Sequence, residues 1–259
     1  MNFVTQRIGR SLARYLAKPL HVHTASVPPD FDALAACLQP ADVLLVEGHS
    51  KISAAVKYLT QSTWSHAALY VGDVLGKRND AGEALCIIEA DMVQGVRAVA
   101  LSQFAGMHCR VCRPFSLQPG DTALVVAHVR DRLGHQYDLK NIVDLVRFLM
   151  PTPPVPQQWR RRWLTLGSGD PTRAICSTLI ASAFEAVSYP VLPTVERRST
   201  QDPLCPLCVY EILHVRHHSL FVPRDFDVSP YFQIIKPTLT QGFDHSLLRW
   251  SDQDQPTPA

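Results

Sequence analysis

The sequence lacks any run of about 18 consecutive apolar residues, the length that a membrane-spanning helix requires. Its N-terminus has neither the continuous apolar segment nor the small-residue cleavage site of a secretory signal. The net charge is only +2, and no basic stretch is interleaved with aromatic residues, so nucleic acid is not an expected partner. No internal repeat is evident. These absences favour a cytoplasmic protein.

Cysteine is present, but the seven residues form no regular disulfide framework, and their odd number is typical of a reducing compartment. Two Cys-x-x-Cys pairs, Cys109 with Cys112 and Cys205 with Cys208, raise the alternative of a structural zinc site. The first pair falls in an expected strand, where residues three apart point to opposite faces. We therefore expect no metal and no other cofactor. The role of the second pair, as a chelator or a disulfide, stays open.

The composition supports a folded core, because 46% of the residues are hydrophobic and only 19% are charged. We expect a main folded domain at residues 40–240, with an insertion rich in Pro, Arg and Trp at 151–170. Residues 1–39 would form an amphipathic helix and a linker, and residues 241–259 a C-terminal tail.

The N-terminal segment has one apolar helical face, formed by Val4, Ile8, Leu12, Tyr15 and Leu16. Basic residues lie on or near the other face: Arg7, Arg10, Arg14 and Lys18. Such a helix either docks on its own domain or rests on an anionic membrane surface. Peripheral membrane association is therefore an alternative to a purely cytoplasmic location.

The residues around Cys176 form the most informative stretch of the chain. Apolar residues follow this cysteine at helical spacing: Leu179, Ile180, Ala183, Phe184 and Val187. The pattern predicts a buried helix that begins near Cys176. A thiol at a helix N-terminus lies among unpaired N–H groups, which favour the nucleophilic thiolate. The alternative is a small buried cysteine that only packs.

Apolar patterns predict strands at 43–46, 67–71, 85–89 and 108–112, and a helix at 139–149. A histidine and a carboxylate accompany two of these strands. His66 stands at the start of the apolar run at 65–72, and Glu89 lies near the end of the run at 85–90. Cysteine, histidine and carboxylate are the groups that thiol-based acyl transfer requires. Each also has a structural alternative: His66 as a satisfied core residue, and Glu89 as a turn cap or as the partner of Arg97.

The chain resembles the permuted papain-like cysteine amidases, the YiiX-like branch of the NlpC superfamily. The motifs that carry the resemblance occur in the family's order at 41–46, 64–72, 88–90 with 95–97, 109–114, 133–138 and 175–180. In this order, residues 95–97 correspond to the turn that follows the carboxylate strand. They span roughly residues 40–187, and the histidine precedes the cysteine, as a circular permutation requires. One departure is Thr178, which stands where the family often has an acidic residue.

The resemblance implies an α+β, circularly permuted papain-like (NlpC-type) fold, with an antiparallel sheet or small barrel packed against helices. It implies a thiol hydrolase that cleaves an amide, such as a peptide or cell-wall fragment, with Cys176, His66 and Glu89 as catalytic residues. Tyr137 and Trp64 are candidate substrate-binding residues, although both could simply pack. A lipid acyl hydrolase or acyltransferase of the lecithin–retinol acyltransferase type and an inactive binding module are the alternatives.

Overall fold

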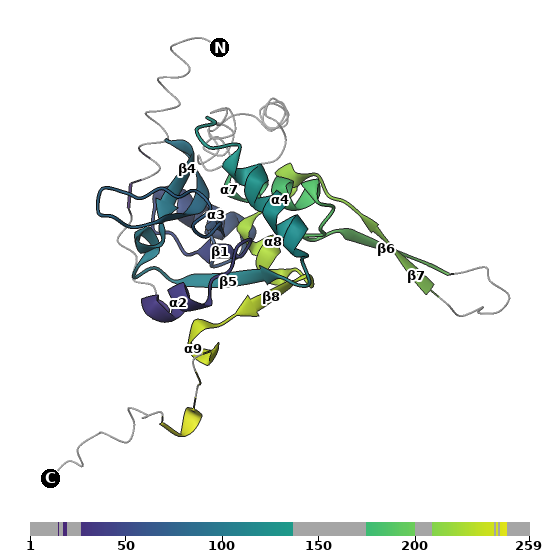
Figure 1. Cartoon of the computed structure of the whole chain (residues 1–259). Coiled ribbons are helices and arrows are strands. Elements are labelled where there is room, and N and C mark those ends of the chain that lie inside the picture. Colours follow the sequence, from purple (N-terminus) through teal and green to yellow (C-terminus); the bar gives the residue numbers. More distant parts are fainter. Residues whose placement is uncertain are drawn as a thin grey trace, which may run out of the picture.

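The computed structural model describes residues 15, 18–19, 27–136, 175–199, 209–240, 242 and 244–247. Its centre is a six-stranded antiparallel sheet with the order β4-β3-β2-β1-β5-β8 (Figure 1). The strands are β1 (Val43–Val46), β2 (His66–Tyr70), β3 (Leu85–Asp91), β4 (Gly95–Ala100), β5 (Cys109–Pro114) and β8 (Phe232–Ile235).

Both faces of the sheet are buried, which explains why its central strand β1 is apolar at every position. Val43 and Leu45 belong to one cluster of core residues, while Leu44 and Val46 belong to a second. Successive side chains of a strand point to opposite faces, so the two clusters are the two sides of the sheet.

Helices α4 (Pro119–Arg130) and α7 (Ile175–Ala186) pack against each other, and α7 also contacts β2 and β3. Leu179 and Ile180 of α7 are buried in the first cluster. The second cluster is completed by Leu34 of α2 (Phe31–Cys37) and Phe104 of the short helix η1 (Leu101–Phe104). A further helix, α3 (Lys51–Thr60), connects β1 to β2.

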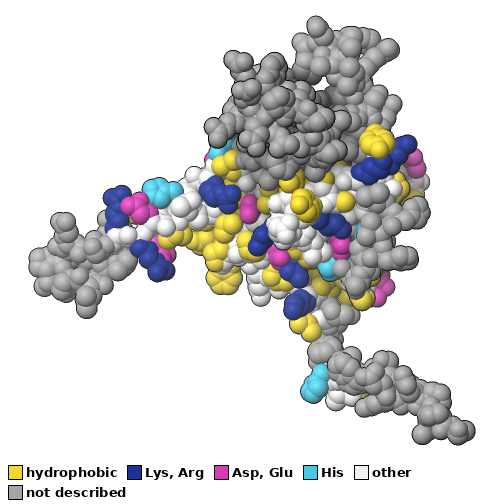
Figure 2. Space-filling model, turned by 180° about the vertical axis from the view of Figure 1, so that it is seen from behind, with side chains coloured by type: hydrophobic (Ala, Val, Ile, Leu, Met, Phe, Trp, Pro, Cys, Tyr) yellow, Lys and Arg dark blue, Asp and Glu magenta, His cyan; other side chains and the backbone are white. Residues whose placement is uncertain are grey.

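The C-terminal half adds a two-stranded hairpin that projects from the body, β6 (Thr194–Ser199) paired with β7 (Val209–His214) (Figures 1 and 2). Charged side chains line this arm and pair across it, as Arg197 does with Glu211 at 2.9 Å. The remaining elements are η2 (His218–Leu220), α8 (Pro223–Val228), α9 (Pro237–Thr240) and η3 (His245–Leu247).

The predicted α+β class with an antiparallel sheet is confirmed, and the sheet is open at β4 and β8 rather than closed into a barrel. The strands expected at 43–46, 67–71, 85–89 and 108–112 are present within two residues. The turn expected at 95–97 is instead the start of β4, because residues 95–100 pair along β3. Within the described ranges, no helix is long and apolar enough to cross a membrane.

Candidate active site

The sheet register places the predicted site residues at one end of neighbouring strands. His66 begins β2 opposite Val46, and Glu89 of β3 lies opposite both Ala68 and Arg97. Cys176 lies in the first turn of α7, the helix that packs on β2 and β3. Residues far apart in the sequence therefore meet because an antiparallel sheet and one helix bring their ends together.

His66 and Glu89 form a direct pair, with 2.7 Å between Nε2 of the imidazole and Oε2 of the carboxylate. Glu89 is only 4% exposed, whereas a quarter of the His66 side chain is exposed. The pair fixes the imidazole, and because Nε2 is engaged by Glu89, Nδ1 is the nitrogen left for a proton exchange with another group.

The second oxygen of Glu89 is held by three N–H donors. Oε1 accepts from Nε and Nη2 of Arg97 at 2.9 and 2.6 Å, and from Nε2 of Gln103 at 2.9 Å. Burial alone would raise the pKa of Glu89, but the hydrogen bonds and positive charges of His66 and Arg97 lower it to about 2. The carboxylate is therefore charged near neutral pH, and both of its oxygens accept hydrogen bonds.

The Cys176 thiol is buried, and His66 is close enough to act on its pKa. Burial acts to raise the pKa of Cys176, but the positive charge and hydrogen bond of His66 outweigh it, and the Ala67 backbone N–H donates toward the sulfur. The pKa of Cys176 is therefore lowered. Its place in the first turn of α7 favours the thiolate further.

The pKa of His66 responds in the opposite direction. Burial acts to lower this pKa, but the negative charges of Cys176 and Glu89 and their hydrogen bonds raise it to about 10. A lowered cysteine pKa and a raised histidine pKa together favour a thiolate–imidazolium pair near neutral pH.

Cys176 differs in this respect from the other described cysteines. Burial raises the pKa of Cys37, Cys86 and Cys112, and raises that of Cys109 to about 12. Cys109 and Cys112 lie in the two different core clusters, on opposite faces of β5. Among the described residues, no group of three or more His, Cys, Asp or Glu is arranged to hold a metal ion. Cys205 and Cys208 lie outside the described residues.

Trp64 is close to His66 in sequence but only 2% exposed. Its indole N–H donates to Oδ2 of Asp227 at 3.0 Å, and its ring packs against His108 and the guanidinium of Arg110. These contacts are those of a packed core residue, the alternative interpretation of this position. Four further predicted features lie outside the described residues: Tyr137, the N-terminal apolar face apart from Tyr15, the helix expected at 139–149 and the insertion at 151–170.

Comparison with protein families tests the resemblance that the motifs indicate. Residues 37–145 match the permuted papain-like amidase enzyme family, YaeF/YiiX, C92. The predicted family resemblance is therefore confirmed. At the level of this family, the chain is similar to thiol amidases. The matched YaeF/YiiX segment contains His66 and Glu89 and ends before Cys176.

Among solved structures, the chain is similar to the metalloprotein YiiX from Escherichia coli O157:H7, with 14% sequence identity and a TM-score of 0.44. That similarity covers 76% of this chain and 96% of the YiiX chain. No curated protein matches the sequence.

Sequence reasoning missed part of the site. It considered Arg97 only as an alternative partner for Glu89, whereas Glu89 binds Arg97 and His66 at the same time, one with each oxygen. It did not select Gln103, which reaches Glu89 from η1. The antiparallel register of β3 and β4 is the signal that places Arg97 opposite Glu89, and this register becomes visible only once 95–100 is recognised as a strand.

Proposed function

We propose that the protein is a thiol amidase that cleaves an amide through a cysteine thioester. The observation that carries the proposal is the Cys176 thiol, whose pKa is lowered by an imidazole that Glu89 holds through its other nitrogen. The similarity of residues 37–145 to permuted papain-like amidases supports the same reaction class.

In the proposed reaction, the Cys176 thiolate attacks the amide carbonyl carbon, and a C–S bond forms. The backbone N–H of Cys176, in the first turn of α7, donates to the oxyanion. The His66 imidazolium gives its proton to the leaving amine as the C–N bond breaks. Water, deprotonated by the now neutral His66, then attacks the thioester and releases the acid and the thiol.

Glu89 serves as the residue that orients the imidazole and stabilises its protonated form. Its buried carboxylate accepts from Nε2 of His66 at 2.7 Å, which directs Nδ1 toward the sulfur. Arg97 and Gln103 hold that carboxylate in place and touch no reacting atom, so they are positioning residues.

Alkylation by iodoacetamide tests whether the Cys176 thiol is activated. If solvent exposure alone set the rate, the more exposed cysteines would be labelled before Cys176, whereas activation of its thiol predicts the opposite order. Cys37 and Cys86 are half-buried, whereas Cys176 is only 7% exposed. Activation by His66 predicts that Cys176 is labelled first at pH 7, as mass spectrometry of quenched samples would show. Labelling of Cys86 before Cys176 would contradict the proposal.

Three variants complete the test: two are assayed with a panel of chromogenic aminoacyl and peptidyl amides, and the third by labelling. Cys176→Ala should abolish hydrolysis while leaving the melting temperature nearly unchanged. The control Cys86→Ala should retain hydrolysis. His66→Gln should remove the labelling advantage of Cys176. Full hydrolysis by the Cys176→Ala protein would refute the mechanism.

A further inference from the structure

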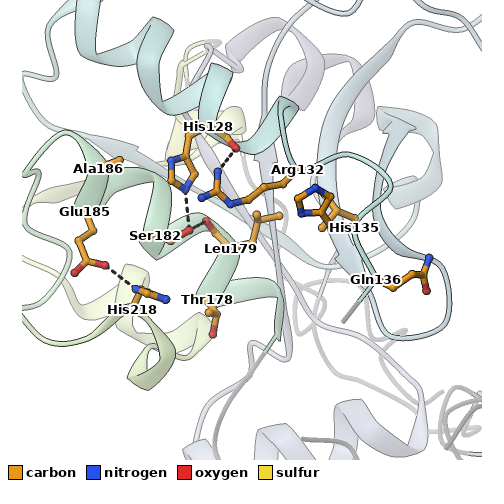
Figure 3. A pocket seen from close by; sticks show the side chains of 11 residues that line it. His128, Arg132, His135, Gln136, Thr178, Leu179, Ser182, Glu185, Ala186 and His218 are labelled. Carbon is orange, nitrogen blue, oxygen red and sulfur yellow. Dashed lines mark hydrogen bonds and ion pairs between the residues drawn. The ribbon is translucent and has the colours of Figure 1, made fainter. Parts of the chain in front are cut away.

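A cavity of about 490 Å³ lies along α7, on the side of the helix that faces the end of α4 and η2 (Figure 3). Its volume falls within the range of small-molecule sites in proteins, roughly 300–1,000 Å³. Val96 of β4 and Leu179 of α7 contribute apolar surface, and charged or polar side chains supply much of the remainder.

Arg132 is the unusual residue of this cavity. It is half-buried, and its Nη1 donates to the backbone oxygen of His128 at 2.7 Å, but no carboxylate among the described residues pairs with it. The other half-buried arginines of the described ranges each pair with an acid: Arg97 with Glu89, Arg110 with Asp227, Arg113 with Asp42 and Arg216 with Asp225. A partly desolvated guanidinium with unused N–H donors favours an anion.

The described polar groups near Arg132 have other partners. Glu185 is the one carboxylate among the described lining residues, and it pairs with Nδ1 of His218 at 2.7 Å. Ser182 donates its hydroxyl hydrogen to the oxygen of Leu179 at 2.8 Å, so it accepts from Nε2 of His128 at 3.0 Å. Among the described lining residues, Arg132 is therefore a guanidinium without a carboxylate partner.

His135 adds a second donor to the same opening. Its side chain is exposed and lines the cavity beside Arg132, as Figure 3 shows, and it has no hydrogen-bond partner among the described residues. Arg132 and His135 lie on one short turn after α4, so two nitrogen-bearing side chains face the cavity from the same segment.

The cavity begins within one helical turn of the nucleophile. Thr178 and Leu179 line it two and three residues after Cys176, and Leu179 also belongs to the core cluster that contains Cys176. At a rise of 1.5 Å per residue, the wall from Thr178 to Glu185 runs about 10 Å along α7. Thr178, the first lining residue of the helix, is therefore about 3 Å beyond Cys176 along the helix axis.

We propose that this cavity binds a carboxylate of the substrate, with Arg132 as its main partner. The inference rests on the thiol amidase function and specifies its substrate class: an amide that carries a free carboxylate a few bonds from the scissile bond. Arg132 would act on substrate binding, not on the acidity of the thiol.

The test uses alkylating probes that differ only in charge. A series of N-bromoacetyl ω-amino acids of increasing length is compared with the corresponding primary amides, and alkylation of Cys176 is followed by mass spectrometry. The sulfur displaces bromide from both probes in the same way. For at least one length, the acid should react with saturation and faster than its amide, by about tenfold or more.

Substitutions of Arg132 test whether the cavity causes the faster reaction of the acid probe. Arg132→Gln should remove the preference for the acid and leave the rate of the amide unchanged, and Arg132→Lys should keep part of it. Arg130→Gln is the matched control, because Arg130 is an exposed residue of the same segment that pairs only with Asp131. It should retain the full preference.

The outcomes separate this inference from the proposed function. If Cys176 is labelled no faster than Cys86 by any probe, the thiol amidase proposal fails. If Cys176 is labelled fast but acid and amide react equally at every length in the unmodified protein, the carboxylate site is refuted and the amidase proposal stands. A preference that persists in folded Arg132→Gln protein also refutes the site. The comparison of acid and amide probes in the unmodified protein uses no variant, so a variant that fails to fold cannot affect its result.

Discussion

Replacing Arg97 by methionine should destabilise the protein, and a second substitution of Glu89 by glutamine should recover much of the loss. Arg97 supplies two of the three N–H donors on Oε1 of a carboxylate that is 4% exposed. Without Arg97, a buried charge keeps only Gln103 and His66. A neutral amide at position 89 has no such charge to compensate.

The magnitude follows from the pKa of Glu89. The difference between about 2 in the folded protein and the ordinary 4.5 corresponds to about 3 kcal/mol, at 1.36 kcal/mol per pKa unit. Burial of the Glu89 carboxylate opposes this stabilisation of its charged form, and both His66 and Arg97 contribute to it. Breaking a fully buried pair costs roughly 3–5 kcal/mol, and Arg97 is 27% exposed, so we expect Arg97→Met to cost about 2 kcal/mol.

Urea unfolding at pH 7 of the unmodified protein, both single variants and the double variant provides the measurement. The free energy of unfolding of the double variant should exceed, by at least about 1 kcal/mol, the value expected from adding the losses of the two single variants. Strictly additive losses would show that Arg97 acts by packing alone, which would refute the reasoning.

The pH dependence gives an independent check. Because the folded-state pKa of Glu89 is depressed, its contribution is fully present above pH 4.5 and is lost as the pH falls toward about 2. In the Arg97→Met protein the same pKa is higher, so less stabilisation remains to be lost. The difference between the two proteins should therefore narrow between pH 4.5 and 2, and a constant difference would contradict the assignment.

Three further predictions concern the surroundings of the site. The rate of Cys176 alkylation should stay high below pH 8, where an ordinary thiol loses about tenfold in rate per pH unit; a tenfold decrease per unit between pH 8 and 7 would show that the thiol is not activated. Trp64→Phe should cost about 1 kcal/mol in a melting experiment, from the lost bond to Asp227, and should leave amide hydrolysis unchanged; a large rise in KM would instead place this ring in the substrate site. Gly95→Ala should cost at least about 1 kcal/mol, because φ is +78° and a Cβ would overlap the backbone oxygen of His135; an unchanged unfolding midpoint would contradict this.

The sheet and the nucleophile helix were predictable because their residues carry local signals. β1 is a short apolar run, and α7 repeats apolar residues at helical spacing after Cys176. By contrast, residues 95–97 were predicted as a turn from the family resemblance, whereas only Gly95, with a positive φ, has a turn-like backbone and the rest of β4 is extended. The hairpin β6–β7 and helix α8 fall in a segment whose prolines and polar residues favour loops.

The proposed catalytic residues were accessible from sequence only through their residue types and the order of the motifs. The structure adds what no spacing encodes: Gln103 reaches Glu89 from a short helix that follows β4, and Arg97 reaches it across the strand register. The cavity lined by Arg132 was not predicted, because it forms where α4, α7 and η2 converge. Arg132 looks in sequence like any arginine at the end of a helix, and its lack of an acidic partner among the described residues is visible only in three dimensions.

The order of the chain has a consequence for how the protein is made. Cys176 follows His66 by 110 residues, so a nascent chain emerging from the ribosome displays its imidazole and carboxylate long before the sulfur is synthesised. Until α7 docks across β2, that sulfur has the acidity of a free cysteine, and truncated products that end before residue 175 contain β1 to β5 but no nucleophile. The permutation thereby delays the reactive thiolate until most of the polypeptide has been translated.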